Sequence, residues 1–193
     1  AVPSLFMSFF PSCLSTFKKE FPRVNIDVVE KASVDIIEDV RKNNIDIGLI
    51  PLVRPYVENC QDLIFETLIQ GKMSVYVDRD SPLTKRKNLA PKDLLGEPII
   101  LYSCEHIKAF TNKLFKPHGT MNIQLTSNNT ELIKKSIAEG LALSFFPDFA
   151  LINDSYLLNG DIISIPLVDD KQVQPDIPFG FVRSRRKFFS FTT

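Results

Sequence analysis

Short polar side chains stand where the chain enters each of four predicted helices. They are Ser4, Ser33, Ser103 with Cys104, and the run 127–130, which contains Asn128. Singly, each can be an ordinary N-cap whose side chain accepts a backbone N–H. Helix N-termini also present free N–H groups and a partial positive charge, so they favour anions. As a set, these residues therefore indicate a site for a small polar or anionic molecule.

One pair of residues has a spacing that could suggest a cysteine nucleophile with a histidine base. Cys104 and His106 are two positions apart, but such a pair also needs an orienting third group in space. A redox role would need a resolving cysteine nearby, and the other cysteines are Cys13 and Cys60. We interpret Cys104 as a loop residue. HExxH, GxSxG and EF-hand motifs are absent, and we predict no catalytic residue.

Cofactor and metal sites have no support in the sequence. The closest glycines, such as Gly140 and Gly160, are 20 positions apart. Walker A loops and dinucleotide fingerprints need glycines a few residues apart, because the backbone must approach phosphate. No two cysteines have zinc-ligand spacing, and the histidines are His106 and His118. We predict neither a cofactor nor a metal.

The first half of the chain alternates predicted helices with predicted strands. Apolar residues recur at helical spacing over 5–17, and residues 24–29 alternate as in a half-buried strand. Ser33 is the predicted N-cap of the next helix, which a strand at 45–50 follows. Two further strands, 65–69 and 72–78, flank Gly71. Short apolar strands between helices favour an α/β sheet covered on both faces.

The second half repeats this pattern, which predicts two similar α/β lobes. Its predicted helices are 91–95, 105–115 and 130–139, and its strands are 98–101, 123–126, 142–146, 162–167 and 179–183. We assign residues 1–76 plus 177–193 to lobe I and 77–176 to lobe II. The strand at 72–78 and the last strand would be the two crossovers. Two lobes joined in this way enclose an interlobe cleft, a common place for ligands.

The composition excludes several classes of protein. The 193 residues are 44% hydrophobic, enough for a core, with 23 basic and 23 acidic residues. A chain that binds DNA by itself should be basic, so we predict no direct DNA contact. Three scattered cysteines indicate a reducing cytoplasm. Residues 1–17 carry no charge, but they are too few to span a membrane. We interpret both ends as cuts from a longer protein.

Five stretches, in order and at matching spacing, resemble the effector-binding (substrate-binding) domain of LysR-type bacterial transcription regulators. They are residues 4–22 with Phe21-Pro22, 43–49, 75–83, 98–102 and 137–147. Three positions depart from the family pattern. Asn43 replaces a usual glycine, Ala142 replaces the second glycine of its run, and Asp80 stands where histidine is common. Asn43 still suits a left-handed helix cap.

The resemblance implies a periplasmic-binding-protein-like (type 2) fold with two lobes, an interlobe cleft and two crossover strands. It also implies a homodimer or homotetramer that contacts DNA only through an N-terminal winged helix-turn-helix, absent from this sequence. The positions that would contact the effector are Ser4, Ser33, Ser103 and Cys104, followed by Pro51 and Asn128. The domain would be a receptor without enzymatic activity, and ligand binding would shift its conformational equilibrium.

Three alternatives share this pattern of elements. A solute-binding protein of a transporter would need an export signal. An enzyme on a similar fold, such as a prephenate dehydratase or a deaminase-type transferase, would need an acid, base or nucleophile set that the sequence does not offer. A domain that only oligomerises would have an apolar cleft without convergent hydrogen-bond donors.

Overall fold

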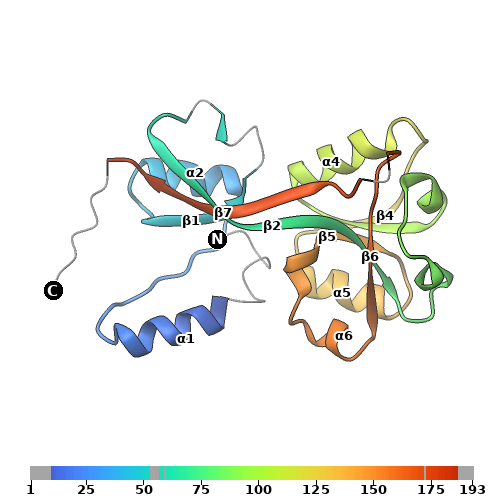
Figure 1. The fold of residues 1–193 in the computed structure, drawn as a ribbon, viewed down its shortest axis with the longest axis horizontal. Helices are drawn as coiled ribbons and strands as arrows, with labels where there is room; N and C mark the ends of the chain where they lie inside the picture. The colour runs from blue at the N-terminus through green and yellow to red at the C-terminus, as the bar shows by residue number, and fades with distance from the viewer. Residues whose placement is uncertain (1–9, 53–56, 59, 172, 187–193) are drawn as a thin grey trace. The chain divides into compact units, whose positions relative to one another are not determined.

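The computed structural model describes residues 10–52, 57–58, 60–171 and 173–186 (Figure 1). The chain divides into two compact units, residues 1–71 with 177–193 and residues 72–176. The first boundary lies between Gly71 and Lys72, inside strand β2 (Leu63–Asp78), and not between 76 and 77. β2 is one continuous strand, so the predicted break at Gly71 is wrong. Gly71 is buried within it.

The first unit contains a sheet in which β7 (Asp176–Ser184) lies between β1 (Ile47–Pro51) and the start of β2. β1 and β7 are antiparallel, from the pair Ile47–Arg183 to the pair Pro51–Phe179. Helix α2 (Ser33–Arg41) packs on β1 through a face that contains Ile36 and Val40. The core of this unit is therefore one helix against a short sheet.

Two glycines allow the close packing of this unit. A Cβ on Gly48 would overlap Ile36 Cγ2 and lie 2.8 Å from Val182 Cγ1. A Cβ on Gly180 would fall on the backbone carbonyl oxygen of Glu66. A backbone atom cannot move aside as a side chain can, so β7 and β2 approach this closely only because position 180 has no side chain.

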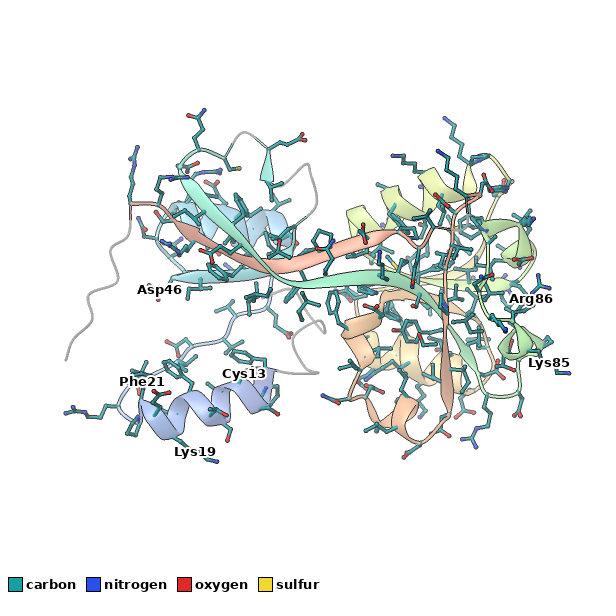
Figure 2. All side chains as sticks on the ribbon, viewed as in Figure 1. Cys13, Lys19, Phe21, Asp46, Lys85 and Arg86 are labelled. Atoms are coloured by element: carbon teal, nitrogen blue, oxygen red, sulfur yellow. The ribbon has the colours of Figure 1, made fainter. Side chains whose placement is uncertain are left out.

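Helix α1 (Phe10–Glu20) and the segment after it differ from the sequence prediction. The described part of α1 begins at Phe10, and residues 24–29 form no strand. Instead, Lys18 Nζ donates to the carbonyl oxygens of Pro22 and Val24 at 2.9 and 2.6 Å. In the view of Figure 2, Cys13 and Lys19 lie on opposite sides of α1. Alternation alone does not make a strand, because a strand also needs a neighbour to pair with.

The second unit has β3 (Pro98–Tyr102) and β4 (Asn122–Ser127) as a parallel pair, with α4 (Glu105–Phe115) between them in the chain. The end of β2 pairs antiparallel with β5 (Ser144–Pro147) and β6 (Ile162–Pro166). Ser144 Oγ donates to the carbonyl of Ile100 at 2.7 Å and ties β5 to β3. The remaining elements are α5 (Thr130–Ala138), α6 (Ser155–Leu158) and three 3-10 turns, Pro82–Lys85, Pro91–Leu94 and Asp148–Leu151.

Aromatic side chains fill the centre of the second unit. The rings of Phe115 and Phe145 meet edge to face with centroids 5.9 Å apart, and those of Tyr76 and Phe146 do so at 5.7 Å. Burial raises the pKa of Tyr76 to about 12, and its hydroxyl donates to the carbonyl of Pro147 at 3.3 Å. Tyr76 is therefore a neutral core residue at physiological pH.

A charged cluster ties α5 to α6 in this unit. Lys134 Nζ forms ion pairs with Asp154 and Glu131 and lies 5.7 Å from the centroid of the Tyr156 ring. The Lys134 side chain is 8% exposed, and Asp154 also accepts from the N–H of Tyr156. Burial by itself lowers the pKa of Lys134, but the hydrogen bonds that its ammonium donates to the two carboxylates outweigh this effect, so the pKa is raised.

Among the described residues, no helix is both long and apolar enough to cross a lipid bilayer.

We predict that Lys134→Ala lowers the free energy of unfolding by about 2–4 kcal/mol, because it leaves Asp154 mostly buried without its partner. Because the Lys134 pKa is raised on folding, the contribution of the pair is fully present below the ordinary lysine pKa and is lost as pH rises through the folded value. Urea unfolding at pH 7 and at pH above 10.5 measures both effects.

The control is Lys135→Ala, at an exposed neighbouring position of the same helix. We expect a change within about 0.5 kcal/mol. Equal losses for the two alanine variants at pH 7 would show that the buried cluster contributes nothing of its own.

Candidate functional site

Parallel pairing of β3 and β4 places two strand ends side by side in the second unit. Tyr102 is in register with Ser127, and the backbone N–H of Ser103 donates to the carbonyl of Ser127 at 2.8 Å. Each strand leads directly into a helix, α4 or α5. Two helix N-termini therefore follow one edge of the sheet, and we call residues 103–104 and 127–130 the polar edge.

The start of α4 has unused capacity for hydrogen bonding. Cys104 is the N-cap, but its side chain makes no capping hydrogen bond, and the first helical bond runs from Lys108 N–H to the Cys104 carbonyl at 3.0 Å. The amides of the first turn have no partner within a helix. Ser103 is exposed and Cys104 half-buried. This terminus can donate to an anionic or polar group.

The start of α5 is capped by the chain itself. Asn129 accepts from the N–H of Leu132 at 3.1 Å, and Ser127 Oγ accepts from the N–H of Asn129 at 3.0 Å. Between them, Asn128 is exposed. Thr130 is 8% exposed, and its hydroxyl has no hydrogen-bond partner in the described chain. Of this group, Asn128 is the exposed side chain that a ligand could reach, and the Thr130 hydroxyl is buried and unpaired.

The predicted effector contacts in the first unit are less accessible to a ligand than those of the polar edge. Ser33 is the first residue of α2 and not its cap, which is Ala32, and it is only 5% exposed. The N-cap prediction for Ser33 is therefore wrong by one residue. Pro51 ends β1 and is half-buried. Ser4 lies outside the described residues.

The sequence named Ser103, Cys104 and Asn128, and the structure brings them to one edge. Capping by the run 127–130 was allowed for in the sequence, and the structure assigns it to Ser127 and Asn129. The bond between the Ser103 N–H and the Ser127 carbonyl has no sign in the sequence, because it depends on the pairing of two strands more than twenty residues apart. The side chain of His106, the possible partner of Cys104, lies outside the described part of the structure.

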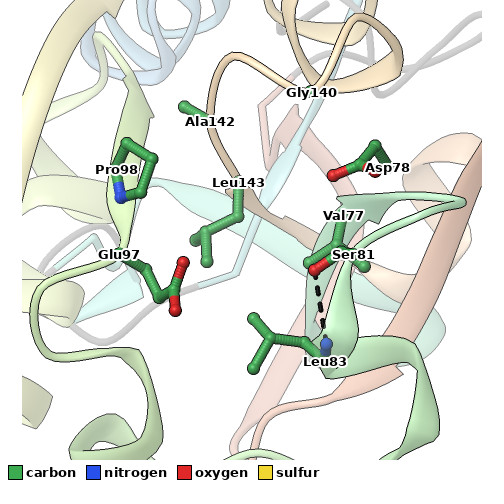
Figure 3. A pocket seen from close by; sticks show the side chains of 9 residues that line it. All are labelled: Val77, Asp78, Ser81, Leu83, Glu97, Pro98, Gly140, Ala142 and Leu143. Atoms are coloured by element: carbon green, nitrogen blue, oxygen red, sulfur yellow. Dashed lines mark hydrogen bonds between the residues drawn. The ribbon is translucent and has the colours of Figure 1, made fainter.

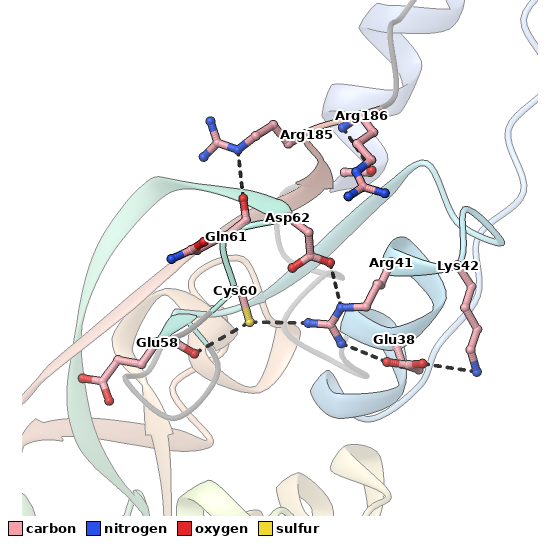
Figure 4. Close-up of polar contacts among 10 residues, drawn as sticks. Glu38, Arg41, Lys42, Glu58, Cys60, Gln61, Asp62, Arg185 and Arg186 are labelled. Carbon is pink, nitrogen blue, oxygen red and sulfur yellow. Dashed lines mark hydrogen bonds and ion pairs between the residues drawn. The ribbon is translucent and has the colours of Figure 1, made fainter.

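A second polar cluster lies in the first unit (Figure 4). The Arg41 guanidinium donates to Asp62 at 2.8 Å, to Glu38 at 2.9 Å and to Cys60 Sγ at 3.6 Å. The hydrogen bond from Arg41 lowers the pKa of Asp62, and the bond to Asp62 raises the pKa of Arg41. These groups hold α2 beside the chain before β2. Mutually satisfied surface charges of this kind tie elements together and offer no reactive group.

Metal chemistry has no support in the described part of the chain, where no three His, Cys, Asp or Glu side chains are grouped to hold an ion. The three cysteines, Cys13, Cys60 and Cys104, are all free thiols. The geometry fits reversible binding of a polar molecule.

Comparison with known proteins agrees with this geometry. The family described as the LysR substrate binding domain matches residues 1–191. The chain is 25% identical over 158 residues to the HTH-type transcriptional regulator MetR of Buchnera aphidicola, covering 81% of this chain and 49% of that protein. The HTH-type transcriptional regulator AlsR of Bacillus subtilis is 26% identical, and the match covers 77% of this chain and 49% of that protein. The chain spans about half the length of these curated relatives.

Solved structures share the fold. The regulatory domain of CcmR from Synechocystis, solved with 2-PG, has a TM-score of 0.79 at 18% identity and covers 97% of this chain and 87% of that one. The effector binding domain of QuiR, solved with shikimate, has a TM-score of 0.76 at 16% identity, with 98% and 87% covered. The expected periplasmic-binding-protein-like α/β fold is confirmed, and the chain belongs to the family of LysR substrate binding domains.

Proposed function

We propose that this domain binds a small polar or anionic metabolite and reports its presence to the DNA-binding part of a LysR-type transcription regulator. The observation that carries the proposal is the polar edge, where the N-termini of α4 and α5 follow paired strands. Backbone amides at such termini favour anions without needing a charged side chain. The related domains solved with 2-PG and with shikimate support a ligand of small size.

The proposed effector contacts from the polar edge are Ser103, Cys104 and Asn128. Ser4, Ser33 and Pro51 of the first unit are the further contacts that the family resemblance implies. Because Ser33 is nearly buried, its contact with a ligand requires a small local shift or the use of its backbone N–H.

Binding would act by population shift. A ligand stabilises the arrangement of the domain that it binds more tightly, by as much as its affinities for the two arrangements differ. In the whole regulator, which would act in the bacterial cytoplasm, that arrangement would change how a winged helix-turn-helix outside this sequence meets DNA. A solute-binding protein or an enzyme is less well supported, because the relatives are transcription regulators.

The proposed regulator is a homodimer or homotetramer. Exposed apolar side chains are concentrated in residues 17–29 of the first unit, at Phe17, Phe21, Val24, Ile26, Val28 and Val29, with exposures of 39–49%. In the second unit, Ile123 and Leu125 are exposed on β4. Contiguous apolar surface on a domain marks a place where another chain binds. We propose that self-association buries these side chains.

We predict that an effector found by screening small carboxylates and phosphates raises the melting temperature by roughly 5–10 °C at a hundred times its dissociation constant. Ser103→Ala and Asn128→Ala should each weaken its binding about 3–10-fold, the value of one hydrogen bond. Isothermal titration measures the affinities. Ser136→Ala is the control, since that hydroxyl bonds within α5.

Unchanged affinity in both Ser103→Ala and Asn128→Ala would place the effector site away from the polar edge. A larger loss of effector affinity in Ser136→Ala than in either of these variants would also place the site away from the polar edge.

We predict that the double variant Ile26→Asp/Val28→Asp is monomeric where the unaltered domain is a dimer or tetramer, because two charges would enter the buried contact. Light scattering after gel filtration measures the mass. Leu158→Asp is the control, as Leu158 is 72% exposed on α6, away from this cluster in the chain. An unaltered domain that is itself monomeric, or a double variant that keeps its mass, would contradict the proposal.

A further inference from the structure

Thr130, the first residue of α5, carries a buried hydroxyl that nothing in the described chain binds. The residue is 8% exposed, and its Oγ1 has no hydrogen-bond partner among the described residues. A buried hydroxyl without a partner is unfavourable, because it has lost its hydrogen bonds to water and gained none in return. Such a group in a folded protein calls for an explanation, and a molecule that binds beside it is one.

The Thr130 side chain lies on the face of α5 that packs on the sheet, at the level where the strands end. It shares that face with the fully buried Ile133 and Ile137, since residues three or four apart lie on one side of a helix. α5 packs on β3 and β4 and starts just after β4 ends at Ser127. Threonine in a helix uses two rotamers, so rotation about one bond can turn the hydroxyl toward the polar edge without moving the helix.

The two helix starts of the polar edge offer a ligand different groups. At α5, the Asn129 side chain already accepts from the N–H of Leu132, whereas the Cys104 side chain makes no capping bond at α4. A negative charge is therefore best placed at α4, whose amides are free and carry the partial positive charge of the helix. At α5, the cation on the face of Thr130 is Lys134, and two carboxylates already hold its ammonium. The part of a ligand that reaches Thr130 should therefore be neutral.

The hollow at the opposite end of β3 is too small to be the site of a metabolite. It is bounded by Pro98, where β3 begins, and by Gly140, just past the end of α5 (Figure 3). It holds about 60 Å³, whereas sites for small molecules usually enclose roughly 300–1,000 Å³. In the second unit, the ligand is therefore better placed at the polar-edge end of β3 and α5.

We propose that the effector is a hydroxy carboxylate, with its carboxylate on the free amides at the start of α4 and its hydroxyl on Thr130 Oγ1. This inference rests on the proposed function, because it assigns the ligand class of the same site. A carboxylate has only acceptors, which match amide donors, and a hydroxyl satisfies both the donor and the acceptor of threonine. Thr130 is then the residue that discriminates a hydroxy acid from the same acid without its hydroxyl.

The test is calorimetric titration of the domain with two matched pairs of ligands, 2-hydroxypropanoate against propanoate and 3-hydroxybutanoate against butanoate. We expect at least one hydroxy acid to bind about tenfold more tightly than its deoxy partner. Thr130→Val replaces the hydroxyl by a methyl of the same shape, so it should remove that preference and leave the affinity for the deoxy acid within about twofold. Thr130→Ser keeps the hydroxyl and should keep the preference.

The melting temperature of the ligand-free domain separates ligand binding from a structural role of Thr130. Because the hydroxyl is unpaired, Thr130→Val should raise the melting temperature by about 2–5 °C. Thr111→Val is the matched control, since that hydroxyl is also buried but donates to the carbonyl of Ile107 at 2.7 Å. It should lower the melting temperature and leave the preference for the hydroxy acid unchanged.

Equal affinities within both ligand pairs, or a preference that survives in Thr130→Val, would overturn this inference. A lower melting temperature in Thr130→Val would also overturn it, because the hydroxyl would then have a partner within the protein. If Ser103→Ala still weakens binding of the acids in these cases, the polar edge remains the effector site and only the ligand class is wrong. If none of these acids binds up to about 10 mM but the wider screen finds another effector, the ligand class is again wrong and the proposed function stands.

Discussion

The parallel pairing of β3 with β4 is the constraint on which the rest of the second unit depends. Parallel strands need a crossover helix, and that helix is α4. Because both strands run the same way, both end at the same edge, and the helices that follow them start there. The hydrogen bond from the Ser103 N–H to the Ser127 carbonyl holds the segments that lead into α4 and α5 next to each other. One strand pair therefore positions both helix starts of the polar edge.

Much of this unit could be predicted because its elements carry strong local signals. The helix at 105–115 was predicted with its observed bounds, since an apolar face ends there at Pro117 and Gly119. The parallel strands were found to within one residue at each end, as short β-branched runs. The polar residues at their ends were named from the same pattern, because strand, short polar loop and helix follow one another directly.

The errors have a different physical origin, since each depends on partners distant in the sequence. Residues 24–29 alternate like a strand but no sheet edge receives them. β2 continues through Gly71 because it has partners on both sides of that residue, β7 before it and β5 and β6 after it.

The most direct test of the effector site is to map backbone amide shifts by NMR while titrating the 193-residue domain with a metabolite that raises its melting temperature. We expect the largest shifts on the amides at the start of α4, residues 103–107, and at the start of α5, residues 128–131. If the largest shifts fall elsewhere in the second unit and these amides do not move, the paired strand ends are not the effector site.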